Sequence, residues 1–247
     1  MNIETFTLAE IVTIKPQAAA LFEKHNLDYC CGGKRKLADV IMNNPSMLHK
    51  VTEELESLLE NKVSADTDFD KLTLGQLVDH IINKHHSYVK RSLPVILMHL
   101  ENVAFKHGDA FPEMKEIAVL FRKLKLDFEQ HMLKEEEVLF PRIKATESFF
   151  ATGEPIEENN SIQYPIHVME AEHENAGRLM NEIKTLSNCY TAPENACMTF
   201  KAGLYELKSF EEDMHTHVHL ENNILFPKAL KMQEQIISGI SSSCILP

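Results

Sequence analysis

The sequence predicts an all-α protein, and three observations lead to that prediction. The 247 residues include only 8 Gly and 10 Pro, too few for a chain of many short strands and tight turns. Leu, Glu, Lys, Ala and Met, which all favour helices, are frequent. Apolar residues recur at alternating intervals of three and four along four long segments, as in helices with one buried face. We therefore expect a four-helix up-down bundle preceded by a small helical domain.

Residues 1–62 form the predicted small helical domain, here called the leader. Pro16 suits the first turn of a helix, where a missing N–H is tolerated. Residues 28–34 read Asp-Tyr-Cys-Cys-Gly-Gly-Lys, a turn signal that carries the paired thiols of Cys30 and Cys31. The polar, acidic segment 63–71 is interpreted as a linker. The helices expected in the leader span residues 7–13, 16–26, 37–43 and 46–61.

The bundle is expected over residues 72–232, followed by a tail at 233–247. Two sequences of the capping-box type, Thr73-x-x-Gln76 and Thr191-x-x-Glu194, precede its first and last helices. Pro112 and Pro193 stand where a first helical turn tolerates proline. The four helices are predicted at residues 72–107, 112–144, 164–188 and 193–232.

Polar residues interrupt each of the four apolar stripes. Every stripe contains one His, and the second and fourth also contain a Glu four residues later. A buried carboxylate without a partner shifts its pKa or destabilises the fold, so these groups need a common compensating partner. A hydrogen-bonded core imidazole would explain one such His, but a metal explains the whole set most simply. The six residues are His86, His131, Glu135, His173, His217 and Glu221.

The sequence also contains an internal repeat. Residues 131–141 and 217–227 share the pattern H-x-x-x-E-x-x-x-L-F-P at an offset of 86. His86 aligns with His173 at an offset of 87. Each half of the bundle is therefore a helix pair, and we expect a pseudo-twofold site.

A His and a Glu four residues apart project from the same helix face and reach the same cavity. Two His for each metal ion, with Glu135 and Glu221 as bridges, would build a dinuclear centre. The donors are nitrogen and oxygen only, which makes iron the natural candidate and leaves manganese and zinc compatible. An open coordination position in such a centre would bind O2, NO or a transferred ligand.

A polar residue is expected to be a metal ligand only if it lies within one of the apolar stripes. His85, His215 and His219 lie outside the stripes and are not expected to be ligands. Asp127 and Glu172 either orient ligand imidazoles or are solvated charges on the helix surface.

A ferritin-like carboxylate site is the competing interpretation of the bundle. Glu170-x-x-His173 and Glu212-x-x-His215 have the E-x-x-H spacing of such sites. His215, however, lies outside the stripe. This alternative predicts an oxidase or a metal store.

Composition limits the partners and the compartment. A net charge of −12 and a pI near 5.5 disfavour nucleic acid, which is bound by clustered Lys and Arg. No run approaches the roughly 18 apolar residues of a membrane span, and the first ten residues do not resemble a secretion signal. Five Cys without framework spacing indicate a reducing compartment. We therefore expect a cytoplasmic protein that binds neither nucleic acid nor membrane.

Two parts of the sequence resemble known families. The bundle, with H-x-x-x-E twice and one His on each remaining helix, resembles the hemerythrin-like di-iron domain. The leader contains Thr-Leu-Ala-Glu-Ile-Val at 7–12, Pro16, and Asp-Tyr-Cys-Cys-Gly-Gly at 28–33. It is similar to the leader of the Repair of Iron Centres family of iron-sulfur cluster repair proteins. Together the two resemblances cover almost the whole chain.

This resemblance implies a function and a set of site residues. Members of the family are cytoplasmic, are often homodimers, and restore iron-sulfur clusters after nitrosative or oxidative stress, by supplying iron or by handling nitric oxide. The implied partners are damaged iron-sulfur proteins and the gases NO and O2. The implied cofactor is an oxo- or hydroxo-bridged centre of two iron ions per chain. By resemblance, the terminal ligands are His86, His131, His173 and His217, and the bridges are Glu135 and Glu221.

The thiol pair matches the family motif. In an exposed Gly-rich turn beside Lys34 and Arg35, Cys30 and Cys31 would have lowered pKa values and act as nucleophiles or soft metal ligands. A half-buried structural pair is the alternative. A hemerythrin-like protein that binds or senses O2 or NO remains an alternative function, but it would leave this pair unexplained.

Overall fold

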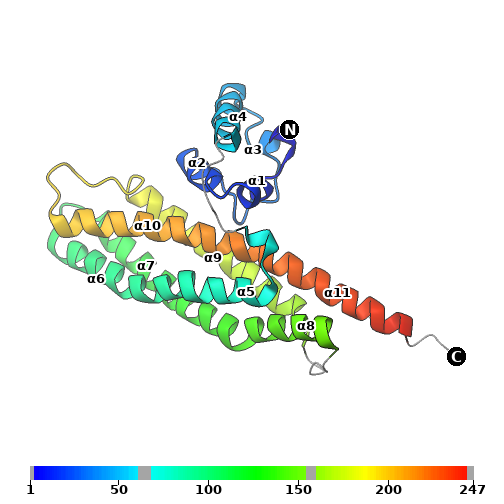
Figure 1. Cartoon of the computed structure of the whole chain (residues 1–247). Helices are drawn as coiled ribbons and strands as arrows, with labels where there is room; N and C mark the ends of the chain where they lie inside the picture. The colour runs from blue at the N-terminus through cyan, green and yellow to red at the C-terminus, as the bar shows by residue number, and fades with distance from the viewer. Residues whose placement is uncertain (1–2, 61–67, 154–159, 244–247) are drawn as a thin grey trace. The chain divides into compact units, whose positions relative to one another are not determined.

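The computed structural model of the chain describes residues 3–60, 68–153 and 160–243. Throughout these residues the regular elements are helical, and the one β-bridge joins Thr7 to Lys36 (Figure 1). The predicted all-α class is confirmed. Within the same residues no helix combines the length and the apolar character that a membrane crossing requires.

The chain divides into two compact units. Unit 1 comprises Met1–Leu77, Thr146–Pro155 and His215–Pro247, and unit 2 comprises Val78–Ala145 and Ile156–Met214. Most of the boundaries between them fall inside helices, so a single helix can contribute residues to both units.

The leader lies in unit 1 and has a core of its own. Its elements are η1 (Ile3–Thr5), α1 (Leu8–Ile14), α2 (Ala18–Lys24), α3 (Leu37–Val40) and α4 (Pro45–Glu60). A capping box starts α1, because the Thr7 side chain accepts from the Glu10 N–H while Glu10 accepts from the Thr7 N–H. Helix α4 packs against α2 and η1, and buried side chains including Leu8, Phe22, Tyr29 and Val51 fill the space between the elements. The four helices lie where the sequence predicts them.

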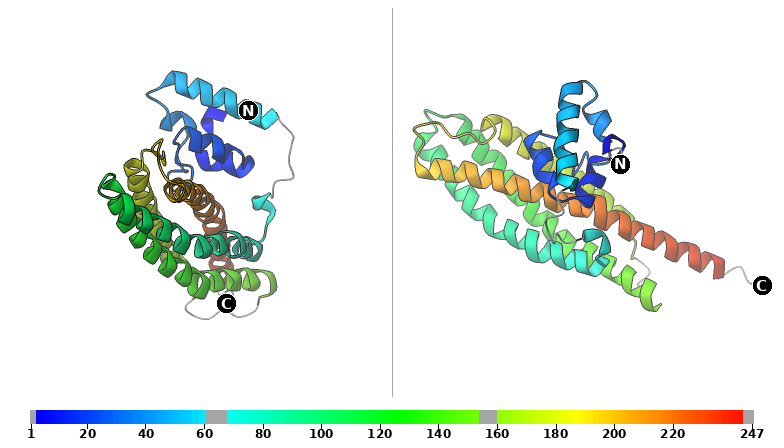
Figure 2. Two further views of the ribbon diagram at one scale, coloured as in Figure 1. Left: turned by 90° about the vertical axis from the view of Figure 1, so that its left-hand side faces the viewer. Right: turned by 45° about the horizontal axis from the view of Figure 1, so that its top comes forward.

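The four-helix bundle is built on unit 2. Helix α6 (Ser87–His107) packs on α7 (Glu113–Lys134), and α7 packs on α9 (Gln163–Leu186). Helix α10 (Met198–Leu220) is linked to α6 by His99–Glu206 at 2.6 Å and to α9 by Lys184–Glu211 at 3.1 Å. Figures 1 and 2 show these four helices lying lengthwise beside one another. The predicted bundle is confirmed.

One of the two predicted capping boxes forms and the other does not. Thr73 and Gln76 form the predicted capping box at the start of α5 (Leu74–His80), with hydrogen bonds of 3.0 and 3.2 Å. The second predicted box is wrong, because α10 begins at Met198. Pro193 lies instead in a preceding turn, where its carbonyl accepts from the Ala196 N–H at 2.9 Å.

The segments expected to be irregular are partly helical. The predicted linker at 63–71 contains η2 (Phe69–Lys71), and residues 61–67 lie outside the described part of the chain. Beyond α10, the chain continues through η5 (Glu221–Leu225) into α11 (Phe226–Ser243), so the predicted tail is helical as far as residue 243. The last four residues, 244–247, are also outside the described part. Helix α8 (Phe140–Thr152) likewise extends beyond the predicted end at residue 144.

Three π-helical turns interrupt the described helices of the bundle. They lie along the apolar stripes, here called the seams, next to the polar residues. They are η3 (Ile81–His86), η4 (Glu135–Leu139) and η5. Each turn adds a residue to the helical repeat, so a seam advances by five residues there. Counted in steps of three and four residues, the apolar stripes of the sequence place Ile82 and Val138 on the buried face. Ile81 is instead fully buried, and Val138 is 42% exposed. These two seam assignments were wrong because the 3.6-residue period does not anticipate a π-turn.

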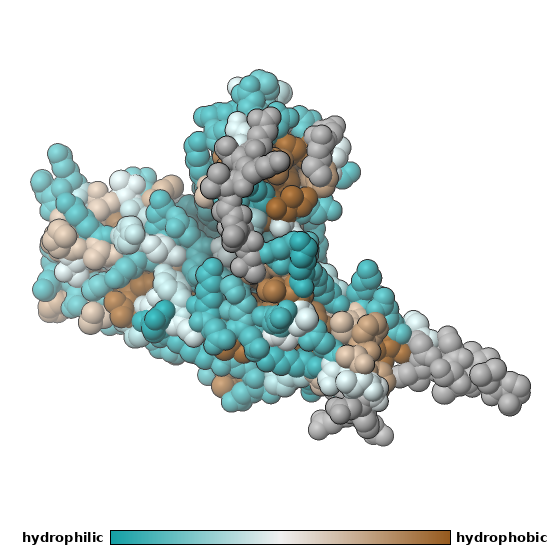
Figure 3. Space-filling model, viewed as in Figure 1, coloured by the Kyte–Doolittle hydropathy of each residue, from teal (hydrophilic) through white to brown (hydrophobic). Residues whose placement is uncertain are grey.

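The surface drawn in Figure 3 is mostly hydrophilic, with smaller apolar areas between the polar ones. Large apolar side chains of the seams are instead buried, among them Leu93, Phe121, Met180 and Phe210. This division is the usual one for helices with a single buried face.

Candidate metal centre

Four of the polar seam residues converge inside unit 2. His86 ends η3, His131 lies in α7, Glu135 begins η4, and His173 lies in α9; each side chain is at most 4% exposed. The Oε2 atom of Glu135 lies 3.3 Å from His86 Nε2 and 3.3 Å from His131 Nε2. His173 Nε2 lies 3.0 Å from His131 Nε2. Nitrogen and oxygen donors from three helices thus point at one another in the core.

The other two polar seam residues lie in unit 1. His217 Nε2 is 2.9 Å from Glu221 Oε1, and both side chains are fully buried. The four-residue spacing from α10 into η5 places them on one face of the helix.

Six buried side chains form two groups that could hold metal ions. Within each group the ligand atoms all lie within 4.8 Å of one another. Glu135 and Glu221 belong to both groups. The first group adds His86 and His217, and the second adds His131 and His173. All donors are imidazole nitrogen or carboxylate oxygen, a set that fits iron and leaves manganese and zinc compatible.

Carboxylates hold the outer nitrogens of two of these imidazoles. His86 Nδ1 donates to Glu136 at 2.7 Å, and His131 Nδ1 donates to Glu172 at 3.0 Å. A proton held on Nδ1 leaves the Nε2 lone pair directed at the centre of the cluster. Glu172 thus takes the orienting role that the sequence left open. No pattern in the sequence singles out Glu136, although it follows Glu135 directly.

Each of these two carboxylates also accepts a hydrogen bond from a lysine. Lys90 donates to Glu136 at 2.7 Å, and Lys134 donates to Glu172. The hydrogen bond from His131, together with Lys134, lowers the pKa of Glu172 to about 2 against the opposing effect of burial. Burial alone would raise the pKa of Glu136, but the hydrogen bonds from Lys90 and His86 outweigh it and lower that pKa. Both groups therefore stay anionic at neutral pH.

His85 is buried, although it lies outside the seam. Its Nδ1 is 2.9 Å from Asp213 Oδ1 of α10, and its side chain is 1% exposed. The burial follows from the π-turn η3, whose wider repeat turns two consecutive histidines inward. His85 belongs to neither metal-binding group of the described residues.

A cavity of about 230 Å³ lies beside the second group. His131 and His173 line it together with Phe128 and Glu172. Because one water molecule occupies about 30 Å³ of liquid, the cavity accommodates a diatomic gas and several waters. It is a route by which a small molecule could approach these two imidazoles.

The ferritin-like alternative is not supported by the arrangement of side chains. Neither Glu170 nor Glu212 belongs to a metal-binding group in the described part of the chain. The Nδ1 atom of His215 lies 2.5 Å from Glu23 Oε1, a leader residue.

The thiol pair lies in a rigid turn of the leader. The Asp28 carboxylate accepts from the N–H groups of Cys30, Cys31 and Gly32 at 2.8 to 3.0 Å. A Cβ atom on Gly33 would lie 2.2 Å from the Tyr29 carbonyl oxygen, so only glycine fits there. The Asp, the two Cys and the Gly pair of the motif thus form one hydrogen-bonded turn.

Cys30 differs from the expected exposed, acidic thiol. Its side chain is buried, and the hydrogen bond with Cys31, burial and Asp28 all raise its pKa. The prediction of a lowered pKa was therefore wrong for Cys30. Cys31 is half-buried and is the more accessible of the two. Neither residue is part of a disulfide.

Family models match both parts of the chain. Residues 77–229 match the hemerythrin HHE cation binding domain, and residues 5–59 match a domain of unknown function, DUF542. The iron-sulfur cluster repair protein YtfE of an Enterobacter species is 35% identical over 223 residues, which are 90% of this chain and 96% of that protein. The chain belongs to the YtfE family of iron-sulfur cluster repair proteins. The expected resemblance is confirmed.

Other YtfE proteins show the same extent of similarity. The protein of Citrobacter koseri is 35% identical over 230 residues, which cover 93% of this chain and 99% of that protein. The protein of Shigella boydii is 35% identical over 223 residues. These YtfE relatives match the leader and the bundle together, so the combination of the two parts is a property of the family.

Proposed function

We propose that this protein repairs iron-sulfur clusters damaged by nitrosative or oxidative stress, by means of a non-haem di-iron centre in the bundle. The relatives carry the name of that activity. The observation that carries the proposal is the pair of overlapping groups with both carboxylates in common. Two separate mononuclear sites would not need to share their carboxylates.

The groups suggest how six ligands would be divided between two iron ions. His86 and His217 would bind one ion, His131 and His173 the other, and Glu135 and Glu221 would bridge them. The internal repeat relates His86 to His173 and His131 to His217. Each ion would thus receive one His from each half of the chain, which agrees with a pseudo-twofold site.

The bound iron would supply an open coordination position for nitric oxide or O2 and a store of iron for a damaged cluster. The protein residues would do the rest. Glu136 and Glu172 hold protons on the Nδ1 atoms of His86 and His131 and so keep both rings in the ligating tautomer. The apolar ring of Phe128 beside His131 limits the water that reaches the centre.

Cys30 and Cys31 are proposed to assist the transfer of iron or nitric oxide. Because Cys31 is the more accessible thiol, it would react first, with Cys30 as a protonated reserve beside it. Thiols that stay reduced in this role suit the reducing cytoplasm, which we propose as the location. Damaged iron-sulfur proteins would be the partners, and the homodimer implied by the family stays a prediction.

The test combines iron content with repair. The purified protein should contain about two iron ions per chain and should reactivate an iron-sulfur enzyme inactivated by nitric oxide. A His131→Ala variant should lose both properties, whereas His99→Ala, which removes a half-buried His of α6 paired with Glu206, should keep both. A protein that contains no iron when expressed with ample iron would contradict the proposal.

Reversible binding of O2 or NO is the second candidate function, favoured by the cavity beside His131 and His173. It requires only the bundle, so the thiols distinguish the two. A double Cys30→Ser, Cys31→Ser variant should keep its iron and its NO binding but lose reactivation if the protein repairs clusters. Full reactivation by that variant would contradict the role of the thiols, whereas a wild-type protein that binds NO but reactivates no iron-sulfur enzyme would favour gas binding.

A further inference from the structure

The end of α10 has a second polar face besides the one with His217 and Glu221. His215, His219 and Asn223 follow one another at intervals of four and form a ridge, here called the outer ridge. A shift of two residues turns a helix by about 200°, so the outer ridge lies opposite the face of His217 and Glu221. Every hydrogen bond or ion pair described below lies within unit 1.

The first two ridge residues contact three different parts of the leader. His215 pairs with Glu23 of α2. His219 Nε2 lies 3.4 Å from the Thr13 hydroxyl of α1, and its Nδ1 lies 3.4 Å from the Tyr29 carbonyl oxygen. The Tyr29 ring also packs edge-on against both imidazoles, with centroids 6.1 and 5.7 Å apart.

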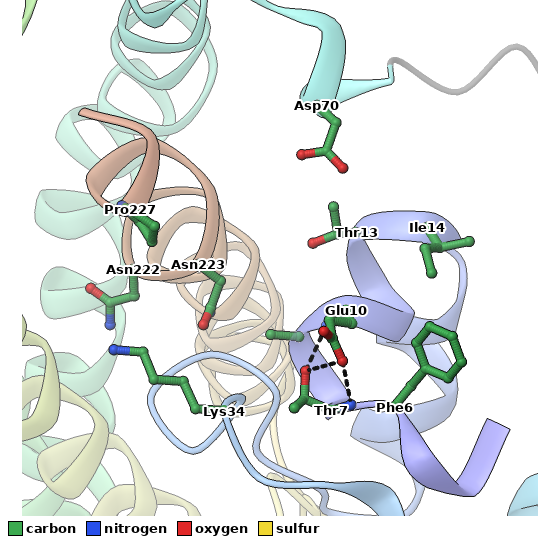
Figure 4. A pocket seen from close by; sticks show the side chains of 11 residues that line it. Phe6, Thr7, Glu10, Thr13, Ile14, Lys34, Asp70, Asn222, Asn223 and Pro227 are labelled. Carbon is green, nitrogen blue, oxygen red and sulfur yellow. Dashed lines mark hydrogen bonds between the residues drawn. The ribbon is translucent and has the colours of Figure 1, made fainter. Parts of the chain in front are cut away.

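Asn223 reaches the thiol turn itself. Its Nδ2 donates to the Cys30 carbonyl oxygen at 2.9 Å and lies 3.5 Å from the Tyr29 carbonyl oxygen. In Figure 4 its side chain points from the helix toward the loop that carries Lys34. These hydrogen bonds use main-chain carbonyls, so they hold the turn without occupying either sulfur atom.

The backbone of the Cys30–Cys31 turn is already restricted by contacts within the leader. Asp28 already binds its N–H groups, and Gly33 is packed against the Tyr29 carbonyl. A rigid turn held at two carbonyls has its side chains fixed as well, because little backbone rotation remains.

We propose that His219 and Asn223 are positioning residues, which hold the Cys30–Cys31 turn against the helical segment that carries His217 and Glu221. This inference rests on the proposed function in one respect, namely that the thiols take part in it. The thiol pair would then be a fixed component of the repair site and not a group on a freely moving arm. His219 and Asn223 would act through the turn, without touching the reacting atoms.

The test uses the full-length, iron-loaded protein and an Asn223→Asp variant. This change keeps the shape of the side chain but removes its N–H donor and sets a carboxylate against two carbonyls. We expect iodoacetamide to alkylate Cys30 about fivefold faster, the increase in opening that corresponds to one lost net hydrogen bond. Peptide mapping by mass spectrometry reports each cysteine separately, so the exposed Cys189 and Cys197 serve as internal references.

Three controls separate positioning from a general loss of structure. Asn223→Gln keeps the amide donor and should restore most of the protection of Cys30. Asn181→Asp makes the same chemical change on the exposed surface of α9 and should leave every alkylation rate unchanged. Iron content and the absorption spectrum should match those of the wild-type protein, because Asn223 is not a proposed ligand.

Equal alkylation of Cys30 in Asn223→Asp and wild-type protein would overturn the proposal. So would a uniform rise at Cys30, Cys189 and Cys197, since it would indicate general unfolding. If Asn223→Asp does not fold, Thr13→Val removes the hydroxyl that lies 3.4 Å from His219 Nε2 and should raise Cys30 alkylation about twofold; no rise would overturn the proposal. Selective alkylation together with a failure to reactivate any iron-sulfur enzyme would support positioning and contradict only the repair function.

Discussion

His131 and His173 face each other across α7 and α9 with their Nε2 atoms 3.0 Å apart. At this separation both nitrogens cannot carry protons, so at least one presents a lone pair toward the other. The His131 ring already donates its Nδ1 proton to Glu172. A metal ion held by both imidazoles would bind both Nε2 lone pairs once neither nitrogen carries a proton.

Replacing His173 by Ala should reduce bound iron to about one ion per chain or less. The change removes one of the two imidazoles in the second group and leaves the first group intact. Iron is measured by elemental analysis against protein concentration. His85→Ala is the stringent control, because His85 is equally buried but belongs to neither group. Equal loss of iron from both variants would show that burial alone, and not group membership, determines iron binding.

A double Glu135→Leu, Glu221→Leu variant should be more stable than the wild-type protein when both are free of metal. The two carboxylates are fully buried, and replacing buried charge by apolar side chains is often neutral or stabilising by about 1 to 4 kcal/mol. Urea unfolding of both apo proteins measures the difference. With iron present the order should reverse, because only the wild-type protein gains binding free energy. A wild-type protein with the same stability with and without iron would contradict this prediction.

Glu136→Gln should weaken iron binding by about 10- to 100-fold while leaving the ligands in place. The amide is a weaker acceptor for the His86 Nδ1 proton and no longer attracts Lys90. Competition with a chelator of known affinity gives the change in affinity. Glu137→Gln, at the exposed neighbouring position, is the matched control and should bind iron normally. Identical affinities for the two variants would remove Glu136 from the site.

Cys31 should be alkylated before Cys30 at pH 7 to 9. The hydrogen bond with Cys31 and burial raise the pKa of Cys30, and only the thiolate reacts rapidly. A raised pKa means that the folded protein holds this proton more tightly than the unfolded chain. The corresponding part of the stability is therefore present below about pH 9 and falls as the pH rises above it. Site-resolved mass spectrometry over this range gives the order, and faster alkylation of Cys30 would refute the prediction.

Local patterns in the sequence account for the fold class and for the six candidate ligands. Helical periodicity depends on residues three and four apart, which one chain displays without knowledge of its neighbours. The same stripes that predict four helices also reveal His86, His131, His173 and His217 as polar interruptions. The internal repeat also predicts a pseudo-twofold site.

The register of the helices at the π-turns does not follow from this periodicity. A π-turn needs a five-residue step, which a periodicity of 3.6 residues does not produce. Ile81, five residues before His86, and Phe140, five residues after Glu135, are therefore buried, whereas the pattern places Ile82 and Val138 in the core. The burial of His85 beside His86 has the same origin.

By itself the sequence determined the class of fold, the chemical type of the donors and the helices on which they lie, because these depend on spacing along a single chain. The tertiary structure decided which histidines share a group, that Glu136 and Glu172 hold two of them, and that Cys30 is buried. It also showed that His219 and Asn223 contact the thiol turn. Each of these depends on which side chains from distant segments meet, and a residue's solvation and pKa are set by those neighbours and not by its position in the sequence.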